Sequence, residues 1–248
     1  MTSGGEGPVL EARGLSKRFG SVVAIEGIDL SIHTGEVTCL LGDNGAGKSP
    51  LIKILSGVFP PSTGELRLDG KPVAVTAPRE ALARGIATVY QDLAMVPLMS
   101  VWRNFHLGSE LTAGRGPLRR IDVGRSKEEA LAALQAIGIE LEDPDQTVAS
   151  LSGGQRQTLA IARALHFGAR VLIMDEPTAA LGVRQSELVL GDIRKAASRG
   201  VAVVLVTHNP FHAHPVGDHF VVLRKGRVKA DQRREDLSVE ELSRLMAG

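Results

Sequence analysis

Apolar and polar residues follow two different patterns along this 248-residue chain. Short apolar runs that end in glycine, asparagine or an acid recur, as in "EVTCLLG" (36–42), "VLIMDEP" (171–177) and "VAVVLVTHN" (201–209). Runs of this length and composition predict buried strands. Other segments have apolar residues three or four positions apart, and this spacing predicts amphipathic helices.

The order of these segments predicts an α/β protein. Short apolar segments separated by glycines and charges predict strands from Val9 to about Ile32. The stretches 48–58 and 184–198 have helical spacing, and each lies between predicted strands. Strands that alternate with helices predict a parallel sheet with helices on both faces.

Residues from about 92 to 160 differ from this alternation and predict a mostly helical insertion. Near the C-terminus, residues 219–230 predict a hairpin that turns near Lys225 and Gly226. Two serine–glutamate pairs have the spacing of a capping box, and each predicts a helix start. The pairs are Ser126 with Glu129 and Ser238 with Glu241.

Composition supports a folded core and excludes some classes of function. Hydrophobic residues make up 43% of the chain and the net charge is +1, so binding to nucleic acid through bulk charge is not expected. The single cysteine, Cys39, lies in an apolar run and is expected in the core. No apolar run approaches the roughly 18 residues of a spanning helix and no signal peptide is recognisable, so we expect a soluble chain.

The stretch "GDNGAGKSP" (42–50) contains the pattern G-x-x-x-x-G-K-[ST], with a predicted strand before it and a predicted helix after it. Such glycines let backbone N–H groups converge on a phosphate at the positive end of the helix. We expect Lys48 at the β- and γ-phosphates and Ser49 at Mg²⁺. The alternative is an ordinary glycine-rich turn. The predicted nucleotide-binding residues are Gly42, Asp43, Asn44, Gly45, Ala46, Gly47, Lys48, Ser49 and Pro50.

Two acids, Asp175 and Glu176, end the buried strand of residues 171–177. An acid at the carboxyl end of a buried strand is expected at a ligand site in an open α/β sheet. We therefore expect Asp175 to hold Mg²⁺, directly or through water. Glu176 is expected to orient or deprotonate an attacking water.

The stretch "LSGGQ" (151–155), taken with the phosphate loop and the acid pair, resembles the ATP-binding cassette family, the ATPases that drive ABC transporters. The resemblance covers nearly the whole chain. In that family this signature motif binds the γ-phosphate of ATP held by the opposite subunit, and glycines at a helix start do offer N–H donors to an anion. The alternative is a flexible glycine turn. The residues to which this role would fall are Ser152, Gly153, Gly154 and Gln155.

The same resemblance gives roles to three further residues. Phe19, in "SKRFGSV", matches the aromatic residue that stacks on adenine, and the alternative is a core aromatic. Gln91, in "VYQD", matches the glutamine that contacts Mg²⁺ and senses the transmembrane partner. His208, in "VTHN", matches the histidine at the γ-phosphate, although a structural role is the alternative. Lys48, Glu176 and His208 are thus the implied catalytic residues.

The fold implied by the resemblance is that of a P-loop NTPase of the ABC ATPase type. It comprises a core with a mostly parallel sheet, an N-terminal antiparallel β subdomain and a helical subdomain. Residues 1–91 and 161–248 are expected to form the RecA-like nucleotide-binding core with the β subdomain. Residues 92–160 are expected to form the helical subdomain with the signature.

Two positions depart from the family pattern. Pro50 stands where threonine is usual, in the first turn of the predicted helix. The missing N–H has no intrahelical partner there, so the helix is expected to form, but the α-phosphate loses a donor and ATP binding is expected to weaken. Gly182 replaces the usual aspartate of a loop that reads "AALG" (179–182), which removes one implied contact across the dimer.

The resemblance implies an ATP-binding and hydrolysing subunit that powers an ABC importer. "YQDLAMVPLMSVWRNF" (90–105) and "DEPTAALGVRQ" (175–185) are similar to the carbohydrate branch, of ribose, xylose and fructose type. The implied partners are a second copy of the chain in an ATP sandwich, a transmembrane permease and, indirectly, a sugar-binding protein, but no nucleic acid. The implied location is cytoplasmic, on the cytoplasmic face of the cell membrane.

Three alternatives stay open at this point. One is a nucleotide-binding regulator with impaired hydrolysis, suggested by Pro50 and Gly182. Another is a non-transport ABC ATPase of translation or DNA repair. The third is a zinc site, which no cysteine and no helical H-x-x-x-H pattern with an acid supports. The histidines close together in the sequence are His208, His212, His214 and His219.

Overall fold

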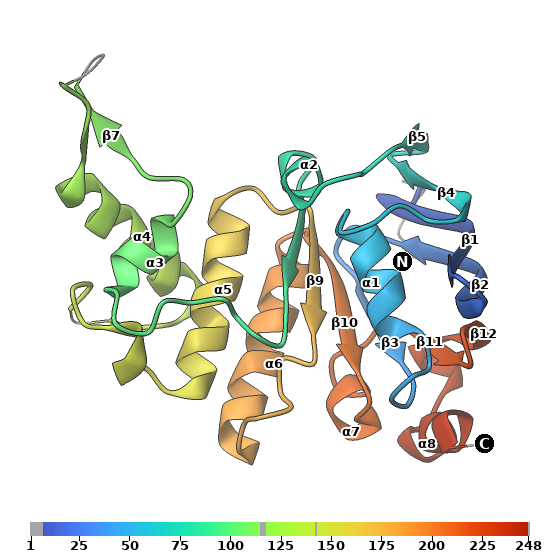
Figure 1. Cartoon of the computed structure of the whole chain (residues 1–248). Helices are drawn as coiled ribbons and strands as arrows, with labels where there is room; N and C mark the ends of the chain where they lie inside the picture. Colours follow the sequence, from blue (N-terminus) through green and yellow to red (C-terminus); the bar gives the residue numbers. More distant parts are fainter. Residues whose placement is uncertain (1–6, 115–117, 142, 248) are drawn as a thin grey trace. The chain divides into compact units, whose positions relative to one another are not determined.

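The computed structural model describes residues 7–114, 118–141 and 143–247, and within them the chain divides into two compact units (Figure 1). The first unit comprises the described residues of Met1–Gln91, Ala169–Pro177 and Ile193–Gly248. The second comprises those of Asp92–Gly168 and Thr178–Asp192. Each unit is built around its own set of elements.

The main sheet of the first unit has the strand order β12-β11-β3-β10-β9-β6. The five strands from β11 to β6 are parallel, and β12 returns antiparallel to β11. The strands are β3 Val37–Leu41, β6 Ile86–Val89, β9 Val171–Asp175, β10 Ala202–Thr207, β11 His219–Arg224 and β12 Arg227–Arg233. Strands β3 and β10 are buried along their whole length, as their unbroken apolar runs predict. The predicted turn at Lys225 and Gly226 is confirmed.

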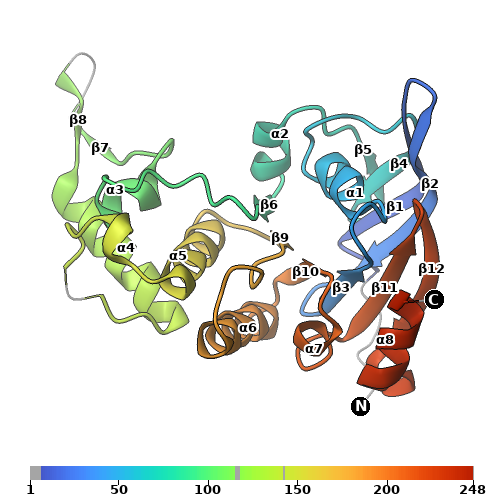
Figure 2. The same ribbon diagram turned by 60° about the horizontal axis from the view of Figure 1, so that its bottom comes forward.

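A second sheet of the first unit is antiparallel and has the order β2-β1-β4-β5 (Figure 2). Its strands are β1 Leu10–Phe19, β2 Val22–Ile32, β4 Thr63–Leu68 and β5 Lys71–Val73. Ile28 of β2, Leu51 of helix α1 (Lys48–Leu55) and Val204 of β10 all belong to one hydrophobic core. The predicted fold class is therefore confirmed, with a mostly parallel sheet, an N-terminal antiparallel sheet and helices.

Three further helices belong to the first unit. They are α2 Pro78–Ala83, α7 Pro210–Ala213 and α8 Val239–Ala247. The capping box predicted before α8 is confirmed, because the Ser238 N–H donates to Glu241 Oε2 at 2.8 Å and the Glu241 N–H donates to Ser238 Oγ at 3.2 Å. Within the described ranges, no helix is both long and apolar enough to cross a bilayer.

The second unit is mostly helical. Its elements are α3 Val101–His106, α4 Val123–Ile137, α5 Gly153–His166, the first part of α6 (Val183–Ser198) and a short hairpin of β7 Thr112–Ala113 and β8 Arg120–Ile121. Phe105, Leu134 and Ile161, from the three whole helices, are buried. Thr158 of α5 donates to Asp192 of α6 at 2.8 Å. The predicted boundary after residue 160 falls inside α5, and the second unit runs on to Gly168 because this helix continues.

The capping box predicted at Ser126 and Glu129 is wrong. Helix α4 begins one turn earlier, because Asp122 Oδ1 accepts the Arg125 N–H at 3.1 Å and caps the helix. Ser126 therefore lies inside the helix, where its hydroxyl donates to the Asp122 carbonyl. Glu129 pairs with Arg125 instead, at 2.8 Å.

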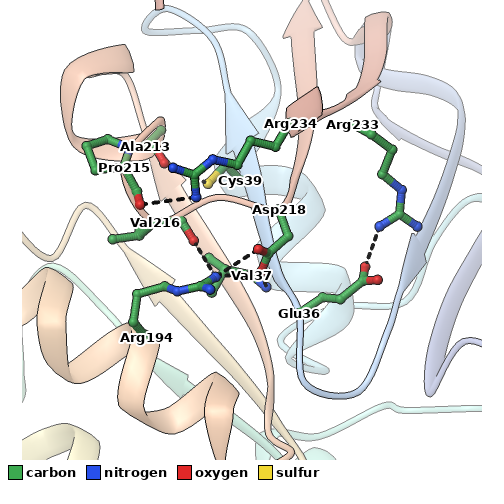
Figure 3. A network of polar contacts seen from close by, with 10 residues as sticks. All are labelled: Glu36, Val37, Cys39, Arg194, Ala213, Pro215, Val216, Asp218, Arg233 and Arg234. Atoms are coloured by element: carbon green, nitrogen blue, oxygen red, sulfur yellow. Dashed lines mark hydrogen bonds and ion pairs between the residues drawn. The ribbon is translucent and has the colours of Figure 1, made fainter. Parts of the chain in front are cut away.

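A polar network fixes the starts of β3 and β11 (Figure 3). The Asp218 carboxylate accepts the Val37 N–H at 2.9 Å, and the Asp218 N–H donates to the Val37 carbonyl. Arg194, near the end of α6, donates to the same carboxylate at 2.7 Å. Cys39 is buried beside this network with its thiol directed at the Ala213 carbonyl, and burial raises the pKa of that thiol. The predicted core position of Cys39 is confirmed.

Leu40→Ala is expected to lower the free energy of unfolding by about 2–5 kcal/mol, because Leu40 is fully buried and the alanine leaves a cavity. Leu82→Ala is the matched control, since Leu82 is 47% exposed on α2 and its loss is expected to cost less than about 0.5 kcal/mol. Urea unfolding of both variants measures the difference. Equal costs would contradict the assigned core.

Candidate functional site

The loop between β3 and α1 follows a path that two glycines make possible. Gly47 caps α1 with a φ of 110°, and a Cβ there would lie 2.8 Å from Cγ2 of Ile25. Gly42 has a φ of 147°, and a Cβ there would lie 2.4 Å from the Leu223 carbonyl oxygen. Any side chain at either position would be strained and would collide. The loop is thus held against β2 and β11.

A cleft of about 150 Å³ opens at the carboxyl ends of β3, β6 and β9. Every residue that lines it is one of the predicted site residues. They are Asp43, Asn44, Gly45, Gly47, Lys48, Ser49, Pro50, Gln91, Asp175 and Glu176. Its volume is smaller than the roughly 300–1,000 Å³ of pockets that enclose a whole small molecule, so it matches only part of a nucleotide, such as its phosphates.

The other predicted site residues lie outside the lining of this cleft. Gly42 and Ala46 belong to the loop itself, and Ala46 is buried. Phe19 ends β1 with 48% of its surface exposed. His208 reaches the cleft through a contact with Glu176. The residues of the signature motif, 152–155, lie at the start of α5 in the second unit.

Lys48 is buried at the floor of the loop. Its Nζ donates to the carbonyl of Gly42 at 2.5 Å and to that of Asp43 at 3.2 Å. Burial lowers the pKa of Lys48, and the nearby charges of Glu176, Asp175 and Asp43 partly offset this effect. An ammonium held by two carbonyls at the positive end of α1 is ready to exchange them for a more strongly charged acceptor.

The pKa of Asp175 is shifted in the opposite direction to that of Lys48. Burial and the neighbouring charge of Glu176 raise the pKa of Asp175, although Lys48 and Lys53 lower it. The positive charges beside Asp175 therefore do not fully offset the cost of ionising its buried carboxyl group. A cation that bound here would relieve this deficit.

Glu176 is held by its backbone and by two side chains. Its φ of 49° is in the left-handed region that non-glycine residues rarely adopt, and its N–H donates to the Val206 carbonyl. Thr207 donates to Oε2 at 3.2 Å, and His208 Nδ1 lies 2.8 Å from Oε1. A carboxylate only accepts, so Nδ1 carries the proton. The contact of Thr207 was not predicted, because a threonine in "VTHN" resembles any other strand residue.

The remaining histidines do not converge. His214 Nε2 contacts the Leu237 carbonyl at 2.9 Å, and His219 pairs with Asp231. Among the residues that the structure describes, no group of three or more histidine, cysteine or acidic side chains is arranged to hold a metal ion.

The start of α5 has the geometry of a capping box. Ser152 Oγ accepts the Gln155 N–H at 3.2 Å, and Gln155 Oε1 accepts the Ser152 N–H at 2.8 Å. The N–H groups of Gly153 and Gly154 lie in the first helical turn, where no intrahelical acceptor exists. Gly153 is partly exposed and Gly154 is buried, so the Gly153 N–H is the more accessible donor for an anion.

The two departures from the family pattern occur at helix starts. Pro50 is the third residue of α1 and lines the cleft, and the Leu51 N–H makes the first helical bond, to Gly47 at 3.2 Å. The expectation that the helix forms in spite of Pro50 is confirmed. Gly182 immediately precedes α6, and its carbonyl accepts the Ser186 N–H at 2.9 Å.

Comparison with known families and proteins supplies independent findings. Residues 25–179 match the family described as ABC transporter. The chain is 41% identical to the xylose/arabinose import ATP-binding protein of Sulfolobus acidocaldarius, over 96% of this chain and 93% of that protein. It is 42% identical to the fructose import ATP-binding protein of Rhizobium meliloti, over 97% of this chain and 94% of that protein. A ribose import ATP-binding protein of Rubrobacter xylanophilus is 43% identical over 97% of this chain but only 47% of its own length.

Solved structures support the fold. An ABC transporter cassette in its ADP conformation superposes with a TM-score of 0.82 at 24% identity, covering 96% of this chain and 94% of that one. A dimeric bacterial ABC transporter cassette superposes with a TM-score of 0.75 at 26% identity, covering 91% and 98%.

Asp175→Asn is expected to raise the melting temperature of the ligand-free protein at pH 7. Folding raises the pKa of Asp175, so the ionised carboxylate lowers the free energy of unfolding at pH values above the folded-state pKa. This loss of stability disappears as the pH falls through the folded-state pKa and the carboxyl group is protonated. Asparagine removes the penalty. The gain over the wild-type protein is therefore expected to be larger at pH 7 than at pH 4 in thermal unfolding.

Asp69→Asn is the matched control with the opposite sign. A hydrogen bond from Arg170 lowers the pKa of Asp69, so its ionised form supports folding above the unfolded pKa and asparagine brings no gain at pH 7. If Asp175→Asn melts no higher than the wild type at pH 7, Asp175 is already compensated.

Proposed function

The chain belongs to the ABC transporter family, and on this premise we propose that it is the subunit that binds and hydrolyses ATP to power an importer for a sugar. The observation that carries the proposal is the cleft, which brings a buried lysine, an acid pair and a helix N-terminus to one edge of a parallel sheet. A sugar as the cargo is supported by relatives that are named as sugar import proteins and match over nearly their whole length.

The triphosphate of ATP would bind at the loop of residues 42–50. Lys48 and Ser49, the first two residues of α1, line the cleft, and the helix adds its positive end. Lys48 would leave the carbonyls of Gly42 and Asp43 for the β- and γ-phosphates, because a charged acceptor is stronger than a neutral one.

The donors present fit Mg²⁺. Ser49, Gln91 and Asp175 line the same cleft and offer hydroxyl, amide and carboxylate oxygens, the kind of ligand that Mg²⁺ prefers. Burial and the charge of Glu176 raise the pKa of Asp175 more than Lys48 and Lys53 lower it, so a further positive charge beside this carboxylate would be favourable. These three residues would hold the ion together with the phosphates, and the bound ion would supply positive charge to stabilise the transferring phosphoryl group.

Glu176 is the residue proposed to act on the attacking water. The carboxylate accepts the water proton or orients the water towards the γ-phosphate. Thr207 and His208 hold its two oxygens in place. Because His208 Nδ1 donates to Glu176, Nε2 is the ring nitrogen that remains for the γ-phosphate.

The signature residues are proposed to act on the ATP of a second copy of the chain. The exposed Ser152 and the N–H groups of Gly153 and Gly154 provide donors for a γ-phosphate. A dimeric cassette among the similar structures supports this pairing. The further proposed partners are a permease and, through it, a sugar-binding protein, with the chain peripheral on the cytoplasmic face of the membrane.

Glu176→Gln is expected to lower the ATPase rate by about two to four orders of magnitude while ATP binding is retained, because glutamine keeps the shape but cannot accept the proton. Phosphate release and ATP titration measure the two properties. The control is Glu235→Gln, an exposed residue whose change is expected to leave both unchanged. A wild-type protein that binds ATP but releases no phosphate, even with its permease, would favour the regulator over the ATPase.

Pro50→Thr is expected to tighten ATP binding by about ten- to a hundredfold. The restored N–H gives the α-phosphate a charge-assisted hydrogen bond, worth about 1.5–3 kcal/mol. Pro78→Thr is the matched control, because Pro78 also lies in the first turn of a helix but does not line the cleft. Equal ATP affinities of the Pro50→Thr and wild-type proteins would show that the N–H is not used.

A further inference from the structure

Two phenylalanine rings meet at the end of β1. The ring centroids of Phe19 and Phe59 are 5.3 Å apart and the ring planes cross at 84°, an edge-to-face arrangement that aromatic quadrupoles favour. Phe59 is partly buried against the core, whereas Phe19 is 48% exposed. Phe59 is therefore the fixed member of the pair, and Phe19 has surface left for another planar group.

The ammonium of Lys17 lies against both rings. Its Nζ is 5.3 Å from the centroid of Phe19 and 4.7 Å from that of Phe59, within the range of cation–π interactions. The same Nζ donates to the Pro60 carbonyl at 2.7 Å. Lys17 thus links the end of β1 to the segment that carries Phe59.

An irregular strand pairing produces this geometry. The register of β1 against β2 shifts between Leu15 and Lys17 and again between Lys17 and Arg18. Such irregularities redirect side chains and are frequent beside ligand sites. The Arg18 N–H donates to Ser62 Oγ at 3.0 Å, so the shifted part of β1 is fixed to the segment between α1 and β4.

Lys17, Phe19 and Phe59 belong to segments that adjoin the elements positioning the phosphate loop. Phe59 follows α1, and its N–H donates to the Lys53 carbonyl of that helix at 3.4 Å, while the loop enters the other end of the same helix. Phe19 pairs with Val22 of β2, and Ile25, further along β2, packs against Gly47 of the loop.

We propose that Lys17 and Phe59 are positioning residues, which hold the ring of Phe19 so that the nucleobase of the bound nucleotide stacks on its exposed surface. This role rests on the ATP binding proposed above. Neither residue lines the phosphate cleft. Their loss therefore weakens the interaction with the base and leaves the phosphate chemistry intact, so that KM rises and kcat at saturation is unchanged.

The test compares ATP with ribose 5-triphosphate, which has the same phosphates but no base, by calorimetric titration in the presence of Mg²⁺. Phe59→Leu is expected to weaken ATP binding about two- to tenfold and to leave ribose 5-triphosphate binding unchanged. Phe59→Tyr keeps the ring and restores ATP affinity. Lys17→Met is expected to lower ATP affinity by part of this amount. Lys17→Arg keeps the wild-type ATP affinity, because a guanidinium also binds aromatic faces.

Phe167→Leu is the matched control, a partly exposed phenylalanine of the second unit that is expected to change the affinity for neither ligand. The positioning role is overturned if Phe59→Leu and Lys17→Met leave ATP affinity unchanged, or if they weaken both ligands equally. A wild-type protein that binds neither ligand contradicts the proposed ATP binding instead. The two failures are thus distinguishable.

Discussion

The register of three parallel strands is the constraint on which the rest of the structure depends. In this register β3 ends opposite Thr207 of β10, and Val206 of β10 lies opposite Asp175 of β9. Because the strands end level, the phosphate loop, Glu176 and His208 leave the sheet at the same edge. A shift by one residue would turn alternate side chains to the other face and separate Glu176 from His208. The cleft is therefore a consequence of strand pairing.

The opposite ends of these strands are organised for stability, and the cleft is not. At the start of β3, the Asp218 carboxylate accepts hydrogen bonds from the Val37 N–H and from the Arg194 guanidinium, which neutralises the charge of Asp218. At the carboxyl ends, Lys48 has a lowered pKa, Asp175 has a raised one and the backbone of Glu176 is left-handed. Such local costs persist only where the surrounding structure imposes them, here the buried sheet.

Local spacing was sufficient to predict the buried strands of the main sheet and most helices, because each depends on residues close together in the sequence. Local motifs also predicted the phosphate loop and the acid pair, whereas Gln91 of the cleft and the antiparallel sheet followed from the family resemblance. The start of α4 was mispredicted because Asp122 and Ser126 are both acceptable caps within about one turn, and spacing does not distinguish them. The contact of Thr207 with Glu176 requires the pairing of β9 with β10. The association of Lys17 with Phe59 requires an irregular register of β1 against β2. Neither pairing is encoded in a short motif.

Pro50 is compatible with helix α1 but lacks an N–H that a bound phosphate could use. The first helical bond of α1 is made by the Leu51 N–H, so the N–H that Pro50 lacks has no acceptor within the helix. Its fixed φ suits the first turn of a helix, and α1 forms in spite of it. Under the proposed ATP binding, the missing donor would matter when a phosphate lies in the cleft, which Pro50 lines. Gly42 and Gly47 are required by the path of the loop, whereas Pro50 lacks a donor that the helix itself does not use.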